Sequence, residues 1–313
     1  MRSHPPTLIT LTRALLRDAA LVERGSRVLV AVSGGPDSMA LLHVLAHLRD
    51  KIGVDLVAHG VDHGLRPEAA AELDRAASFA RDLAVPFDRT RVAVEPGGNL
   101  QARARDARYA ALRAAAAHAR CDRIATAHHM NDRAETFLIR LLRGSGARGL
   151  AVLPPRAGEL IRPFSRADRA TIDAHILRHA IPSSVDPSNR DARFLRARVR
   201  HELLPLLTEL SPKIVAHLCA LADELVQSPA PPFASLDLPR ATRLALAALA
   251  ARPSPRAEIR LPGGLVATLG RDHSRRTKPG DAADSDDNAP RNSVARAARI
   301  RWKHPPHDGR HHK

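Results

Sequence analysis

A glycine-rich turn followed at once by a carboxylate is the first feature of the sequence that could do chemistry. Residues 28–38 read VLVAVSGGPDS, an apolar run that ends in two glycines and restarts as a helix. Such a turn gathers backbone N–H groups and the positive end of a helix dipole at one point, which favours a phosphate. Glycines suit it because no Cβ separates the backbone from the anion. We expect nucleotide contacts from Ser33, Gly34, Gly35, Pro36, Asp37 and Ser38.

The carboxylate of Asp37 would repel a polyphosphate unless a cation lay between them. No lysine occurs between residues 28 and 49, so the turn is not the G-x-x-x-x-G-K-[ST] loop of kinases and GTPases. Mg²⁺ is the cation that proteins hold with one or two carboxylates together with substrate phosphates. In the simpler alternative, Asp37 only complements the helix dipole, which is worth about 0.3–1 kcal/mol.

A second polar cluster follows another apolar run, at residues 128–135, with the sequence HHMNDRAE. Asp132 and Glu135 are three residues apart and therefore share one face of the helix that begins there. One carboxylate could complete a magnesium site with Asp37, and the other could hold an amine. Alternatively, Asp132 is an ordinary helix cap. A zinc site is disfavoured, because the H-E-x-x-H pattern is missing.

These residues need a scaffold, and the hydrophobic pattern predicts a parallel α/β sheet with helices on both faces. The expected strands are 28–32, 55–59, 87–92, 123–126 and 160–162, and the expected helices between them are 38–48, 67–84, 100–119 and 131–143. In such a sheet both polar clusters follow strands and meet at their carboxyl ends. Helical segments then follow at 168–179, 192–207 and 211–227.

The predicted domain organisation has three parts. Residues 1–208 form the main domain, residues 209–270 a small, mainly helical second domain, and residues 271–313 a disordered basic tail, because the tail has too few apolar residues to repay its ordering entropy. No apolar stretch reaches the roughly 18 residues of a membrane span. We therefore expect a cytoplasmic protein with no membrane partner.

The composition favours a polyanionic partner. The formal net charge is +16 and the pI about 11.3, as expected for a protein that neutralises nucleic-acid phosphates. A coding bias is the alternative, because only five of the 49 basic residues are lysines in an alanine-rich chain. Aromatic residues make up 3% of the chain, too few for base stacking to dominate binding. Cys121 and Cys219 form no C-x-x-C motif.

Five motifs follow one another along the chain: SGGPDS, VDHGLR, NLQARARDARYAAL, AHHMNDRAETFL and DPSNRDARFLRARVRHELLP. In order and at fitting distances, they resemble those of the tRNA(Ile)-lysidine synthetase family. The first is shared with the wider N-type ATP pyrophosphatases, and together they cover about residues 25–207, with a fainter echo at 258–265.

The resemblance implies an adenine-nucleotide α-hydrolase-like sheet followed by a small substrate domain. It also implies a two-step ligation on the wobble cytidine of a tRNA(Ile) with the anticodon CAU. ATP adenylates the ring carbonyl oxygen and releases pyrophosphate, and the ε-amine of free L-lysine then displaces AMP. The implied partners are ATP, Mg²⁺, free lysine and this tRNA. The oligomeric state stays open, with a homodimer as one option.

The same resemblance suggests roles for individual residues. Asp37 and Asp132 would hold Mg²⁺ and, with Arg108, act in catalysis. Lysine would be bound by Asp132, Glu135, Arg105 and Arg108. Transfer-RNA phosphates would meet one helical face with Arg193, Arg196 and Arg200, although an ordinary solvated arginine face is the simpler interpretation.

Three positions depart from the family pattern. Asn131 stands where an aspartate is usual, Arg133 where glutamine is usual, and Ala197 where asparagine is usual. Two rival functions stay open. One is a tRNA thiolase of the same superfamily, which generally needs a cysteine pair. The other is a non-catalytic RNA-binding relative. This alternative stays open because Asn131 replaces one of the usual carboxylates.

Overall fold

The computed structural model describes residues 6–64, 68–93, 97, 100–184 and 195–227, together with residues 242 and 245 and three short strands within 258–303. The chain divides into two compact units, Met1–Ser228 and Pro229–Lys313, which are considered separately. The boundaries expected at residues 208 and 270 stay predictions. The strands of the first unit are β1 (Arg27–Val32), β2 (Asp55–Asp62), β3 (Phe87–Arg91), β4 (Arg123–Ala125), β5 (Arg156–Ala157) and β6 (Leu160–Ile161).

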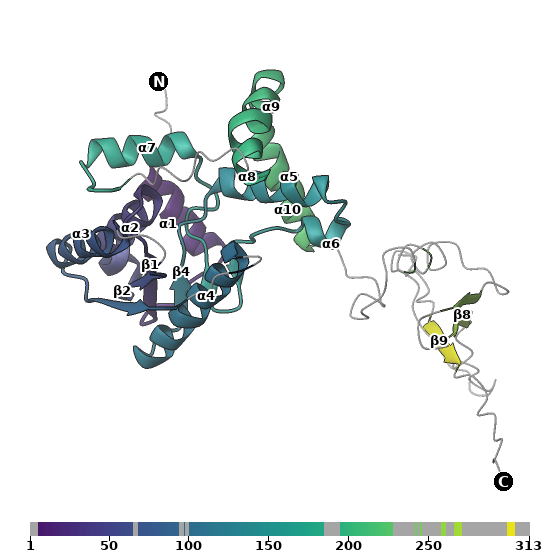
Figure 1. Cartoon of the computed structure of the whole chain (residues 1–313), viewed down its shortest axis with the longest axis horizontal. Coiled ribbons are helices and arrows are strands. Elements are labelled where there is room, and N and C mark those ends of the chain that lie inside the picture. The colour runs from purple at the N-terminus through teal and green to yellow at the C-terminus, as the bar shows by residue number, and fades with distance from the viewer. Residues whose placement is uncertain are drawn as a thin grey trace, which may run out of the picture. The chain divides into compact units, whose positions relative to one another are not determined.

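Six strands form one sheet in the order β3-β2-β1-β4-β6-β5 (Figure 1). All pairs are parallel except β5 with β6. The main helices between and after the strands are α1 (Leu8–Asp18), α2 (Pro36–Ile52), α3 (Glu68–Asp82), α4 (Leu100–His118), α5 (Met130–Leu142) and α7 (Arg169–Arg178), and a four-residue helix, α6 (Ala147–Leu150), follows α5. The predicted parallel α/β class is confirmed.

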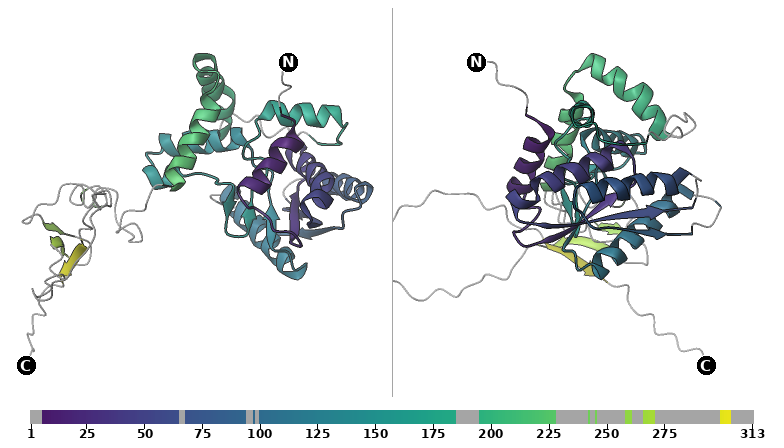
Figure 2. Two further views of the ribbon diagram at one scale, coloured as in Figure 1. Left: turned by 180° about the vertical axis from the view of Figure 1, so that it is seen from behind. Right: turned by 90° about the vertical axis from the view of Figure 1, so that its left-hand side faces the viewer.

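Alternating side chains of β1 build the core on both faces of the sheet. Val28, Val30 and Val32 belong to a cluster with α1, α2, α3 and α7, whereas Leu29 packs with α4. This follows from the two-residue period of a strand. The two views in Figure 2 show α4 on the opposite face of the sheet from α2. The sheet is thus covered on both faces, as its apolar strands predict.

The strand order reverses beside β1, and this fixes where a ligand can enter. The chain goes from β1 to β2 and β3 on one side, then returns to place β4 on the other side of β1. The turns that follow β1 and β4 therefore diverge and leave a crevice at the carboxyl ends of the strands. Both polar clusters singled out in the sequence lie in these two turns and in the first turns of the helices that follow them, α2 and α5.

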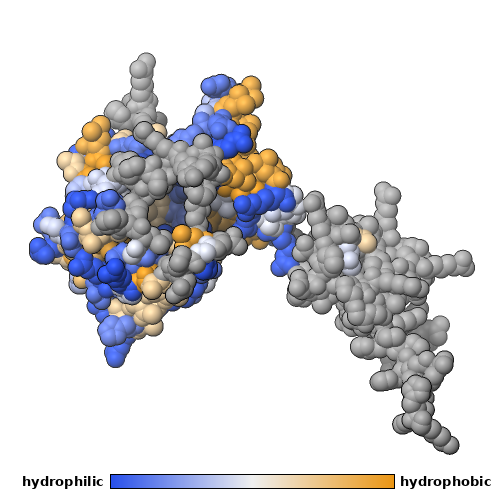
Figure 3. All heavy atoms as spheres, in the orientation of Figure 1, coloured by the Kyte–Doolittle hydropathy of each residue, from blue (hydrophilic) through white to orange (hydrophobic). Residues whose placement is uncertain are grey.

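A helical segment completes the first unit. It comprises α8 (Leu195–Arg198), a π-helical turn (Val199–Leu203), α9 (Leu204–Leu210) and α10 (Ile214–Gln227). Phe137 of α5 and Ala222 of α10 are buried in one cluster. Apolar side chains are also exposed over α9 and α10 (Figure 3), among them Leu206, Leu210 and Leu221.

In the described part of the chain no single helix is both long and apolar enough to cross a membrane. The segments Leu195–Leu210 and Ile214–Gln227 satisfy length and composition only as a pair, which is bent by 99°.

The second unit contains a three-stranded antiparallel sheet in the order β7-β8-β9. Its strands are β7 (Glu258–Arg260), β8 (Val266–Gly270) and β9 (Arg299–Lys303). The expected disordered tail, 271–313, therefore contains one paired strand, in which apolar residues alternate with basic ones. Its other residues lie outside the described part of the chain.

Candidate active site

The turn after β1 is shaped by one serine and one glycine. Ser38 accepts a hydrogen bond from the Ser33 backbone N–H at 3.1 Å and donates one from its hydroxyl to the Gly35 carbonyl at 2.9 Å. Gly34 has φ +78°, and a Cβ there would lie 2.8 Å from the backbone oxygen of Glu72. Glycine is therefore required at this position both by conformation and by space.

Helix α2 begins directly at this turn and offers its N-terminus to a ligand. Gly35 is the N-cap residue and makes no side-chain capping bond, and Pro36 occupies the first turn of the helix. The N–H groups of that turn are the orphan donors of a helix start, and they carry the positive end of its dipole. An anion is the natural partner for such a group.

The carboxylates of Asp37 and Asp132 meet at one imidazole. Nε2 of His129 lies 3.8 Å from Oδ2 of Asp37 and 3.5 Å from Oδ2 of Asp132. His129 is buried, at 3% exposure, in the turn after β4. The fold therefore brings together the two acidic residues that the sequence analysis paired, from the turns after two neighbouring strands.

The pKa of Asp37 is raised above its ordinary value. Burial is the main cause, and the negative charges of Asp132 and Asp173 act in the same direction, while His129 and Arg169 oppose them. A carboxylate in this condition is short of positive charge. Binding of a cation beside it would therefore be favoured.

The carboxylates of Asp132 and Glu135 are paired with two arginines from the helical segment. Arg196 donates from Nη2 to Oδ1 of Asp132 at 3.0 Å and from Nε to Oε2 of Glu135 at 2.9 Å. Arg200 donates from Nε to Oε1 of Glu135 at 2.6 Å and from Nη2 to its Oε2 at 3.0 Å. Glu135 is 1% exposed, so these bonds satisfy a buried charge.

Arg196 and Arg200 do not form the ordinary solvated face that was the simpler interpretation of the sequence. The spacing predicted a shared helical face for Arg196 and Arg200, and both do reach the same carboxylate, but that face is turned toward the site. Arg193 lies outside the described residues. Contact of these residues with tRNA stays a prediction.

Asp132 also performs the capping role that was the alternative interpretation. It accepts the His129 backbone N–H at 3.2 Å, while the His129 ring accepts the N–H of Asn131, so α5 begins with a reciprocal capping box. Burial by itself would raise the pKa of Asp132, but His129, His128 and Arg196 hold it below its ordinary value. The residue is therefore ionised at neutral pH.

Arg105 and Arg108 lie on α4 with their guanidinium groups 5.5 Å and 5.4 Å from the ring centre of Tyr109. Their charge also reaches the site. The pKa of His128 is lowered to about 3, first by burial and further by Arg162, Arg105 and Arg108, although Asp132 opposes this. His128 is thus a neutral ring beside a positively charged edge of the site.

Each of the three departures from the family pattern has a defined place. Asn131 accepts the Arg169 backbone N–H at 3.0 Å through its side-chain oxygen. Arg133 is 2% exposed and donates to Asp223 of α10, with the shorter distance 2.5 Å. The Arg133 side chain therefore lies inside the first unit rather than at its surface. Ala197 is buried, at 9% exposure, in α8.

Arg169 is a site residue that sequence reasoning missed. It is the first residue of α7, and its Nη1 donates to Oδ1 of Asp37 at 2.7 Å. The helix start itself was expected at residue 168, and Asp168 does cap the helix. Nothing in the sequence shows that this helix begins beside the turn after β1.

The donor set suits one kind of metal ion. Among the described residues no group of three or more His, Cys, Asp or Glu side chains could hold a metal ion by itself. Asp37 and Asp132 are a pair of carboxylates, and Mg²⁺ is commonly bound by one or two carboxylates, with water and phosphate oxygens as its other ligands. The residues present therefore fit a magnesium ion that is shared with a bound phosphate.

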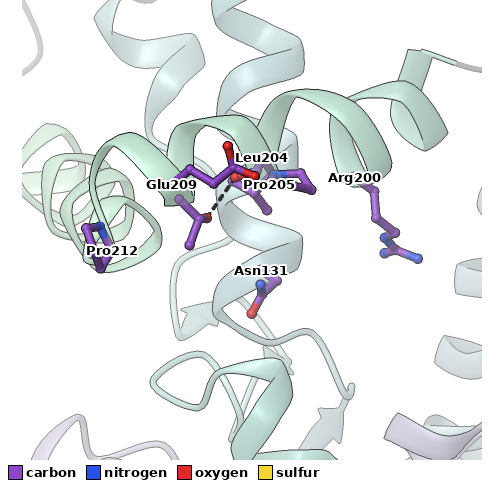
Figure 4. A pocket seen from close by; sticks show the side chains of 7 residues that line it. Asn131, Arg200, Leu204, Pro205, Glu209 and Pro212 are labelled. Carbon is purple, nitrogen blue, oxygen red and sulfur yellow. Dashed lines mark hydrogen bonds between the residues drawn. The ribbon is translucent and has the colours of Figure 1, made fainter.

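A cavity of about 580 Å³ lies next to these residues (Figure 4). Asn131 lines it from α5, and the helix that carries Arg200, Leu204 and Pro205 forms its opposite wall, as Figure 4 shows. Thr208, Glu209 and Pro212 complete the lining. A substrate group in this cavity would contact Asn131 and Arg200, which adjoin the acidic pair.

Comparison with known proteins gives consistent matches. The family model of the PP-loop domain matches residues 9–207. The tRNA(Ile)-lysidine synthase of Thermobifida fusca is 42% identical over 224 residues, which cover 70% of this chain and 69% of that protein. The tRNA(Ile)-lysidine synthase of Symbiobacterium thermophilum is 44% identical over 66% of this chain, but the chain spans only 45% of that relative.

A solved structure shares the fold. The U34-tRNA thiolase NcsA of Methanococcus maripaludis, described with its [4Fe-4S] cluster, aligns with a TM-score of 0.61 and 17% identity over 74% of this chain and 84% of that chain. At this identity the likeness shows the architecture alone.

Proposed function

The chain belongs to the tRNA(Ile)-lysidine synthase family of PP-loop ATP-binding proteins, and from this premise we propose that it ligates free L-lysine to the wobble cytidine of a tRNA(Ile) with the anticodon CAU. The reaction would consume ATP and release AMP and pyrophosphate. The observation that carries the proposal is the meeting of Asp37 and Asp132 at His129, beside a glycine turn suited to phosphate.

In the first step the ring carbonyl oxygen of the cytidine would attack the α-phosphorus of ATP, and pyrophosphate would leave. The N–H groups of residues 33–38 would hold the departing phosphates. Asp37 and Asp132 would hold Mg²⁺, which when bound neutralises charge on those phosphates. Arg108 lies with Arg105 at the charged edge near His128 and would bind a phosphate or the lysine carboxylate with two hydrogen bonds.

In the second step the ε-amine of lysine would attack the activated ring carbon, and AMP would leave. We propose Asp132 and Glu135 as partners of the lysine ammonium groups. Their oxygens are taken by Arg196 and Arg200 in this structure. Lysine binding therefore requires these guanidinium groups to move, and tRNA phosphates are the partners we propose for them in the complex.

The nearest rival function is that of a tRNA thiolase. The environments of the two cysteines argue against this function. Burial raises the pKa of the Cys219 thiol to about 11 and also raises that of Cys121. Cys219 donates to the Met130 carbonyl at 3.4 Å, whereas Cys121 packs in the separate cluster of α4. Neither thiol is activated, and the two do not form a pair that could deliver sulfur.

The test is to incubate the protein with ATP, Mg²⁺, labelled lysine and a CAU transcript, and to follow pyrophosphate release and lysine incorporation. We expect Asp37→Asn to abolish both while tRNA binding stays unchanged. Asp50→Asn is the matched control, because Asp50 lies on the same helix with its side chain 95% exposed.

Other outcomes would replace the proposal. Release of pyrophosphate that needs tRNA, without any incorporation of labelled lysine when lysine is supplied, would favour the thiolase. Tight tRNA binding without any pyrophosphate release would favour the non-catalytic relative. Loss of tRNA affinity in Asp37→Asn would contradict the metal-binding role of this residue.

A further inference from the structure

A phosphate site normally contains a fixed positive side chain, yet the turn after β1 has none of its own. The guanidinium that contacts its carboxylate comes from Arg169, 132 positions along the chain. We propose that Arg169 is the phosphate-binding cation of this site: it rests on Asp37 while no nucleotide is present and transfers to the β- and γ-phosphates when ATP binds. This rests on the proposed use of ATP.

The guanidinium of Arg169 is paired with two carboxylates, both of them partly exposed. Nη1 donates to Oδ1 of Asp37 at 2.7 Å, and Nε and Nη2 face Asp173 at 3.1 Å and 2.9 Å. The side chains of Arg169 and Asp37 are 41% and 32% exposed. Partly exposed ion pairs of this kind are weak, so a polyphosphate can displace the carboxylate.

The backbone of Arg169, by contrast, is held in place. Its N–H donates to the Asn131 side chain at 3.0 Å, which ties the start of α7 to the start of α5. Ile172, one turn further along, is fully buried in the core with α1 and α2. Arg169 therefore has a fixed backbone and a movable guanidinium. The guanidinium can bind phosphate oxygens with two parallel hydrogen bonds.

The exchange has a second effect on Asp37. While Arg169 is paired with Oδ1, one oxygen of the carboxylate is occupied and part of its charge is balanced. When the guanidinium moves to the phosphates, the carboxylate becomes available to a divalent cation. Arg169 would thus compete with the cation before nucleotide binds and assist the nucleotide afterwards.

This competition predicts opposite effects of one substitution, Arg169→Ala. We expect the affinity for ATP with Mg²⁺ to fall about tenfold or more, because charged hydrogen bonds are lost. AMP, which lacks the β- and γ-phosphates, should bind within about twofold of the intact chain. The affinity of the nucleotide-free protein for Mn²⁺ should rise, because a competitor for Asp37 has been removed.

Isothermal titration with ATP and AMP, and electron paramagnetic resonance with Mn²⁺, measure these affinities on the full chain. Arg166→Ala is the matched control, since Arg166 lies three residues earlier and pairs with Asp18 instead. Arg169→Gln, which keeps most of the side-chain length, should show the same pattern and guards against misfolding of the alanine variant.

Unchanged ATP affinity in both variants would overturn the inference. Equal losses for ATP and AMP together with weaker Mn²⁺ binding would also overturn it, because they would indicate a structural role. The proposed function fails separately, if the intact chain binds ATP but transfers no lysine.

Discussion

Replacing Gly34 by alanine tests the geometry of the phosphate-binding turn most directly. Gly34 has φ +78°, and an added Cβ would lie 2.8 Å from the Glu72 carbonyl oxygen and 2.9 Å from the Glu72 Cβ. Gly25 provides the control, because its φ is +85° but nothing lies within 4 Å of its added Cβ. Both variants thus suffer the same backbone strain, and only one meets a neighbour.

The expected magnitudes follow from these two contributions. The left-handed conformation costs an L-residue about 1–2 kcal/mol, which applies to both variants. Forcing a methyl group against packed backbone adds about 1–3 kcal/mol at Gly34 alone. We therefore expect Gly25→Ala to lower the free energy of unfolding by about 1–2 kcal/mol and Gly34→Ala by about 2–5 kcal/mol.

Urea unfolding followed by far-UV circular dichroism measures both values. The single tryptophan, Trp302, belongs to the second unit rather than to this sheet. Gly34→Ala should also lose ATP binding at temperatures where it is still folded, whereas Gly25→Ala should retain it. Equal destabilisation of the two variants, or normal ATP binding by Gly34→Ala, would refute the close approach of α3 to the turn.

Further predictions concern the buried arginine, the histidines between α2 and α7, and salt. Asp223→Ala should destabilise the fold by about 1–3 kcal/mol in urea unfolding, because it leaves the buried Arg133 without its acceptor; Glu202→Ala, at an exposed pair, should leave the unfolding midpoint nearly unchanged. Burial lowers the pKa of His43 and takes that of His175 to about 4. The unfolded chain therefore binds protons that the folded chain does not, and the free energy of unfolding should fall as the pH drops from about 6.5 toward 4. His175→Gln should flatten that slope, and an unaltered slope would contradict the assignment. The other groups that lower the pKa of His175 are His179, Arg178 and His47. Binding of tRNA should weaken steeply between about 50 and 200 mM salt if the positive charge of the chain contacts phosphates, and a flat response would favour coding bias.

The sheet could be read from the sequence because its strands are apolar runs separated by helices of regular period. Residues 28–32 were expected and Arg27–Val32 is observed; the last parallel strand shrinks to Leu160–Ile161. The parallel pattern also predicted that Asp37 and Asp132 would meet, since both follow strands whose carboxyl ends share an edge.

The partners of the arginines could not be predicted in this way. Periodicity places Arg196 and Arg200 on one helical face, but it does not say which surface that face meets, and the structure supplies Glu135. The charge of Arg133 favours a position at the surface. Its side chain is buried instead, because its acceptor Asp223 lies on a helix 90 residues later. Such pairings are set by tertiary packing, which local pattern does not encode.

The return of the chain to place β4 beside β1 has a consequence for synthesis. Val28 pairs with Arg123, so 95 residues must leave the ribosome before the two halves of the crevice can close on each other. A nascent chain that has completed only β1 to β3 contains the turn after β1 and Asp37, but it does not yet contain Asp132. The two acidic residues of the crevice can therefore come together only after β4 and the start of α5 have been synthesised.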